Sequence, residues 1–142
     1  MPPNFPKFAQ GLLRGFANFG KGALVLLRLW RATLNSRNGM IFAARSERAI
    51  REELIAMVLA VPAAWLIGVT MMRRVELVCA VALVLVVELL NTAIEKLADR
   101  LTMDRDPQIG RVKDMGSAAV GVALLMAGAF WLFAVAERIG VI

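Results

Sequence analysis

The alternation of apolar and polar positions predicts three membrane-spanning helices, at residues 54–72, 75–100 and 115–136. The first and the third contain no charged residue, and the apolar part of the second, residues 77–94, contains only Glu88. Each apolar part has roughly 18 to 22 residues, enough to cross a hydrocarbon layer of about 30 Å. Pro107 and Gly110 lie between the second and third helices, so residues 101–111 are expected to form a loop or hinge.

The first 53 residues have a different pattern. Three prolines in residues 1–6 predict an extended lead. Apolar residues then recur at helical spacing over residues 7–34 with Lys and Arg between them, which is typical of an amphipathic helix in the membrane interface. Residues 35–39 predict a turn, and residues 40–53 a second amphipathic stretch. The expected fold is all-α and integral to a membrane, with residues 1–53 at the interface and residues 54–142 as the transmembrane part.

Composition and charge support this class and suggest an orientation. The 142-residue chain is 59% hydrophobic, lacks tyrosine and has a net charge of +6. The basic residues concentrate before the first span and between the second and third, so the positive-inside rule places the N-terminus in the cytoplasm and the C-terminus outside. These clusters lack interleaved aromatic residues, which favours anionic lipid headgroups over nucleic acid as their partner.

The second span carries a polar series, Glu88, Asn91, Glu95 and Asp99, on one helical face. Steps of three, four and four residues keep the series within roughly an 80° arc. A carboxylate at membrane depth costs about 2.5 to 3.5 kcal/mol on insertion scales, so Glu88 is a candidate functional residue. The alternative is a polar seam between helices, in which Glu88 is protonated or paired with a basic residue.

The residue types in this region suit phosphoryl chemistry. The chain has no histidine, so a general base near neutral pH has to be a carboxylate, a lysine or a thiol. Mg²⁺ is usually held by one or two carboxylates together with substrate phosphates. Glu95 with one of three carboxylates before the first span would meet that need; these are Glu47, Glu52 and Glu53.

Two blocks of this sequence resemble the prokaryotic diacylglycerol kinase family of small integral membrane enzymes. The first is Glu88-Leu-Leu-Asn-Thr-Ala-Ile-Glu95-Lys-Leu-Ala-Asp99-Arg100, and the second is Gly110-Arg-Val-Lys-Asp-Met-Gly-Ser-Ala-Ala119. The stretch from Glu47 to Glu53 also matches, and Arg28 falls where the family has an arginine. Lys96 departs from the motif, in which that position is often apolar.

The resemblance implies a homotrimer that transfers the γ-phosphoryl group of ATP to diacylglycerol at the cytoplasmic face of the bacterial inner membrane. Glu88 would be the general base, and Glu47 and Glu95 would hold Mg²⁺. Four residues would contact the nucleotide: Arg28, Glu95, Lys113 and Asp114. Four others would position the site or the substrate: Asn91, Asp99, Ser117 and Arg74.

Two other functions stay open from the sequence. A related branch phosphorylates undecaprenol and shares much of the first block, although the residues from Met115 to Ala119 look more like the diacylglycerol branch. The protein could also be a non-enzymatic membrane module or a small channel, with Glu88 as a polar anchor. A channel predicts a polar stripe along the whole second span, and residues 77–87 offer only Cys79.

Overall fold

Four helices make up the described parts of the chain, residues 7–101 and 106–141 of the computed structural model; side chains are described from Leu24 onward. They are α1 (Lys7–Ser46), α2 (Arg48–Ile67), α3 (Met71–Leu101) and α4 (Pro107–Arg138). No strand occurs in these residues. The chain divides into two units, Met1–Phe42 and Ala43–Ile142, and each is considered by itself. The expected extended lead, residues 1–6, lies outside the described residues.

The first unit is occupied by α1, which runs without interruption through residues 35–39. The turn predicted there is wrong. Asn, Ser and Gly are weak helix formers, with glycine costing about 1 kcal/mol relative to alanine, but none of them removes a backbone donor as proline does. The helical sequence on both sides therefore continues through the segment.

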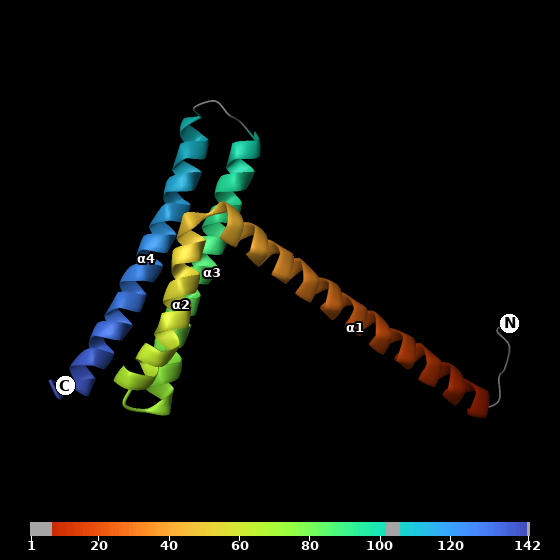
Figure 1. Ribbon diagram of the computed structural model, residues 1–142. Coiled ribbons are helices and arrows are strands. Elements are labelled where there is room, and N and C mark those ends of the chain that lie inside the picture. Colours follow the sequence, from red (N-terminus) through yellow and green to blue (C-terminus); the bar gives the residue numbers. More distant parts are fainter. Residues whose placement is uncertain (1–6, 102–105, 142) are drawn as a thin grey trace. The chain divides into compact units, whose positions relative to one another are not determined.

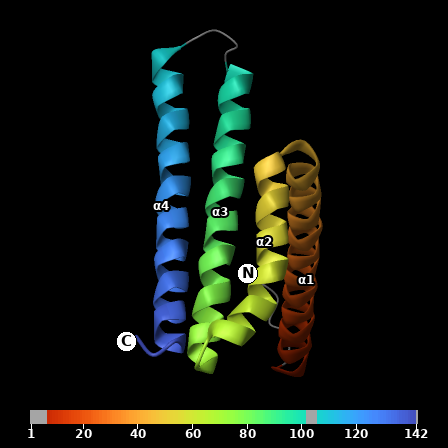
Figure 2. The same cartoon turned by 60° about the vertical axis from the view of Figure 1, so that its left-hand side comes forward.

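In the second unit α3 lies between α2 and α4, which touch each other little (Figures 1 and 2). Small residues allow close packing of α3 against α4, and one cluster consists of Ala80, Val84, Ala123 and Ala127. A second cluster joins all three helices through Ala64, Leu77 and Ala134. The outward faces are apolar, as Leu66, Leu125 and Leu132 illustrate at 74% exposure or more. The second unit therefore has an apolar exterior around a thin, alanine-rich core.

The helix boundaries correct the sequence-based expectation at two places. The first apolar helix, α2, ends at Ile67 rather than at residue 72, because Gly68 begins a tight turn into α3. A Cβ atom on Gly68 would collide with the Arg74 side chain and the Ala64 carbonyl, so the turn requires glycine here.

The second correction concerns α4, which begins at Pro107 rather than near residue 115. The Asp106 carboxylate accepts hydrogen bonds from the backbone N–H groups of Gln108, at 2.7 Å, and Ile109, at 3.4 Å. Proline at the first helical position has no N–H to leave unpaired, so Asp106 and Pro107 form a helix start rather than a loop.

Two of the described helices, α3 and α4, are long and apolar enough to cross a membrane. At 1.5 Å per residue the 31 residues of α3 extend about 46 Å, which exceeds a hydrocarbon layer of about 30 Å. One end of α3 must therefore project beyond the hydrocarbon if the helix spans it.

Candidate active site

The polar series predicted on one face lies in the second half of α3. Asn91 is buried at 7% exposure, Glu88 and Glu95 are half-buried, and Asp99 is exposed. The Asn91 Nδ2 atom donates a hydrogen bond to Glu95 Oε1 at 3.1 Å. The spacing argument is thus confirmed for Asn91 and Glu95, whose side chains meet one helical turn apart.

Glu47 approaches this face from the residue just before α2. Its Oε1 atom lies 2.6 Å from the Lys96 Nζ atom, and both side chains are half-buried. The hydrogen bond from Lys96 lowers the pKa of Glu47, followed by smaller contributions that include the positive charge of Lys96. Glu95 and Glu47 lie near enough to Glu88 for their negative charges to repel a charge on its carboxylate. Three of the predicted carboxylates therefore share one neighbourhood.

Lys113 connects the start of α4 to the same face of α3. Its ammonium group forms an ion pair with the Asp99 carboxylate. The α4 residues Asp114 and Ser117 are exposed. Cations that lie beside carboxylates at the end of a membrane helix can neutralise phosphate oxygens.

Glu88 opens into a cavity of about 370 Å³ where α2, α3 and α4 meet. Its lining is mostly small or apolar apart from three carboxylates, and consists of Ala49, Glu52, Glu53, Ala56, Glu88, Val120 and Leu124. The cavity can thus receive an apolar molecule and bring a polar group on it to Glu88.

Glu53 lines this cavity together with Glu52, and the sequence indicates each of the two only as a possible Mg²⁺ ligand. The Glu53 Oε2 atom is buried and has no hydrogen-bond partner. Its position immediately before the apolar stretch was the available signal, but that position alone does not show which helix Glu53 faces.

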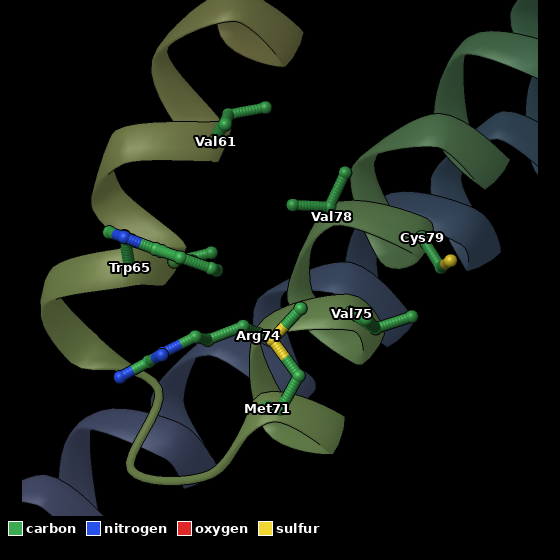
Figure 3. Close-up of a pocket in the computed structure, with 8 residues that line it drawn as sticks. Val61, Trp65, Met71, Arg74, Val75, Val78 and Cys79 are labelled. Atoms are coloured by element: carbon green, nitrogen blue, oxygen red, sulfur yellow. The ribbon is translucent and has the colours of Figure 1, made fainter.

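Arg74 does not join this group. It lies fourteen residues before Glu88 on the same helix, about 21 Å away along the axis. Its guanidinium stacks over the Trp65 ring at 4.5 Å from the centroid, and its Nε donates to the Gly68 carbonyl at 3.1 Å. Figure 3 shows both side chains among the residues that line a second cavity, which lies between α2 and α3 and has a volume of about 240 Å³. Arg74 therefore stabilises the α2–α3 turn in this chain.

Arg28 belongs to the first unit, where its side chain is exposed on α1. Its predicted nucleotide contact concerns the other unit and stays a prediction.

The donor set fits Mg²⁺ only in combination with a phosphate-bearing ligand. Within the described side chains, no group of three or more His, Cys, Asp or Glu residues could hold a metal ion. Two carboxylates, Glu47 and Glu95, are nevertheless sufficient when nucleotide phosphates complete the coordination shell. The residues present therefore fit a metal that arrives with the nucleotide.

Comparisons with known proteins find one family model and several related enzymes. Residues 34–135 match the family model of prokaryotic diacylglycerol kinase. The chain is 40% identical over 111 residues to a diacylglycerol kinase from Pseudomonas aeruginosa, covering 78% of this chain and 90% of the relative. It is 41% identical over 104 residues to a diacylglycerol kinase from Escherichia coli, covering 73% and 85%. For one from Haemophilus influenzae the identity is 35% over 106 residues, covering 75% and 90%.

Proposed function

The chain belongs to the prokaryotic diacylglycerol kinase family, and from this premise we propose that it transfers the γ-phosphoryl group of ATP to diacylglycerol. The product is phosphatidic acid, and the reaction takes place at the cytoplasmic face of a bacterial inner membrane. The observation that carries the proposal is the cavity at Glu88, which has apolar walls and lies beside a set of carboxylates and cations. A lipid can enter such a cavity from the membrane while a nucleotide approaches from water.

The position of the polar groups along α3 supports entry of the lipid from the membrane and of the nucleotide from water. About 20 residues counted from Leu77, where the apolar part of α3 begins, fill the hydrocarbon layer, which leaves Glu88 within it, Glu95 near its boundary and Asp99 in water. Basic residues cluster at this end of the second unit, which supports a cytoplasmic location for it. In this topology α2, α3 and α4 are the three membrane helices, and the C-terminus lies outside.

In the proposed reaction the lipid hydroxyl oxygen attacks the γ-phosphorus, the bond from the γ-phosphorus to the bridging oxygen breaks, and ADP leaves. The hydroxyl proton passes to the Glu88 carboxylate. Glu47 and Glu95 would hold Mg²⁺, which would supply positive charge to neutralise the phosphates. Lys113 and Asp114 bind the nucleotide, and Asn91, Asp99 and Ser117 position the site. Phosphoryl transfer requires mainly alignment and charge neutralisation, which these groups can provide.

We propose a homotrimer as the working assembly. Two small residues on α4, Gly121 and Gly128, are seven positions apart and so share one face of the helix. A Cβ atom at either glycine would find no neighbour within 4 Å among the described residues, so this face of α4 is open within the second unit. Small residues on an open face of a membrane helix favour close approach of another helix.

The decisive experiment offers γ-labelled ATP and Mg²⁺ with diacylglycerol or undecaprenol, separately, in mixed micelles. Purified wild type and Glu88→Gln are compared. We expect label on diacylglycerol with wild type only. Label on undecaprenol alone would reassign the acceptor, and label on neither would overturn the kinase proposal. Full activity of a folded Glu88→Gln protein would remove Glu88 from its role as base.

A further inference from the structure

Gly116, in the second block of the family resemblance, has no role in the reaction proposed above. We propose that Gly116 is a positioning residue for the metal site, because it lets the Asn91 carboxamide lie against α4 and hold the Glu95 carboxylate in place. This inference rests on the proposed function, in which Glu95 binds Mg²⁺. One position of α4 then requires glycine, and this glycine affects the metal site only through Asn91.

The contact between the two helices is unusually close at this point. A Cβ atom on Gly116 would overlap the Asn91 Oδ1 atom and lie 3.3 Å from its Cγ. The oxygen therefore occupies the space that any other side chain at position 116 would need. Because a Cα–H bond of glycine points into that space, it can make a weak Cα–H···O contact with the amide oxygen.

The rest of the carboxamide faces Glu95. Asn91 Oδ1 is buried without a conventional hydrogen-bond partner, while Nδ2 donates to Glu95 Oε1 at 3.1 Å. The reverse orientation of the amide would turn an acceptor oxygen toward the Glu95 carboxylate and leave a buried N–H₂ group against Gly116. The glycine contact and the carboxylate therefore determine the amide orientation together.

A methyl group added at position 116 would enter the space that the Asn91 carboxamide occupies. An alanine at position 116 must displace the Asn91 carboxamide, since the backbone of α4 cannot retreat without loss of its packing against α3. The displaced amide no longer donates to Glu95, whose carboxylate loses its fixed orientation. Partners that orient a ligand typically contribute about tenfold to a hundredfold in metal affinity.

The test measures metal binding rather than turnover alone. Full-length protein in micelles is titrated with Mn²⁺, a paramagnetic probe, in the presence of a non-hydrolysable ATP analogue, and free Mn²⁺ is followed by electron paramagnetic resonance. Gly116→Ala should raise the Mn²⁺ dissociation constant by about tenfold or more. Gly110→Ala is the matched control, because it is also in α4 and a Cβ there meets nothing within 4 Å. It should leave the constant unchanged.

A double variant separates action through Asn91 from general damage. Asn91→Ala alone should weaken Mn²⁺ binding, and Gly116→Ala should add no further loss in that background, because the displaced group is already gone. An additive further loss would overturn the proposal, as would an unchanged dissociation constant in a folded Gly116→Ala protein.

If Gly116→Ala fails to fold, the double variant still decides the matter. Asn91→Ala provides the space for the new methyl group, so recovery of a folded double variant supports the contact as the cause, and failure of the double variant contradicts it. Because Mn²⁺ binding is read without a lipid acceptor, this pattern can hold even if the protein phosphorylates neither lipid. That result would overturn the proposed function and leave the role of Gly116 standing.

Discussion

The ammonium group of Lys96 lies 2.6 Å from the carboxylate of Glu47 and joins the end of α3 to the start of α2. Lys96 therefore places a cation on one of the two carboxylates proposed to bind Mg²⁺. The metal must therefore compete with a resident positive charge. The lysine that departs from the family motif is also the one that contacts a proposed ligand.

Replacing Lys96 by Met should strengthen apparent Mg²⁺ binding, because Glu47 then loses its competing cation. The pair is partly exposed, so solvent screening limits the effect to about threefold in the half-saturating Mg²⁺ concentration. Turnover measured against Mg²⁺ at fixed ATP provides the value. Lys96→Arg retains the charge and should change little, and Arg100→Met tests an exposed cation four residues away. A higher Mg²⁺ requirement in Lys96→Met would show that the lysine assists the site rather than competing with the metal.

Replacing Glu95 by Gln should raise the Mg²⁺ concentration required for half-maximal activity by about tenfold or more, because one of two anionic ligands becomes neutral. The amide of Gln retains an acceptor oxygen for Asn91, so the hydrogen bond at this turn can persist. Mg²⁺ titrations at several ATP concentrations measure the effect. Glu76→Gln, on the same helix but near its other end, is the control. An unaltered Mg²⁺ titration would exclude Glu95 as a ligand.

How well the sequence predicts the structure differs between elements. Apolar length identified the three long helices of the second unit, and the spacing of three and four residues identified a face on which Asn91 and Glu95 do bond. Turn-forming residue types misled at residues 35–39, which continue a helix, and at Asp106 and Pro107, which begin one.

Contacts between helices were less accessible from the sequence. The rotation of α2 about its own axis decides whether Glu47, Glu52 or Glu53 faces α3, and apolar periodicity determines that rotation only coarsely. The cavity shared by Glu53 and Glu88, and the contact of Asn91 with Gly116, depend on such rotations and on local backbone approach. Arg74 is a different case, because its separation of fourteen residues from Glu88 on one helix already implies a distance of about 21 Å along the axis.

The far end of the second unit should contribute stability without affecting the reaction. Arg73 Nη1 lies 2.7 Å from Glu76 Oε2, and Arg73 Nε lies 2.8 Å from Glu137 Oε2, so the start of α3 is tied to the end of α4. All three side chains are partly buried, and Glu137→Gln removes the charge from the link between the helices. We expect a loss of about 1 kcal/mol in the free energy of unfolding.

The control for this change is Glu52→Gln, whose partner Arg48 is 84% exposed at the side chain; breaking that pair should cost less than about 0.5 kcal/mol. Glu137 is 24 residues from Lys113 along α4, about 36 Å away. The KM for ATP and the Mg²⁺ dependence of Glu137→Gln should therefore equal those of wild type under conditions in which both are folded. A change in either constant would mean that the two ends of the unit are coupled, and that the ion pair at the far end helps to align α4 with the face that carries Glu88.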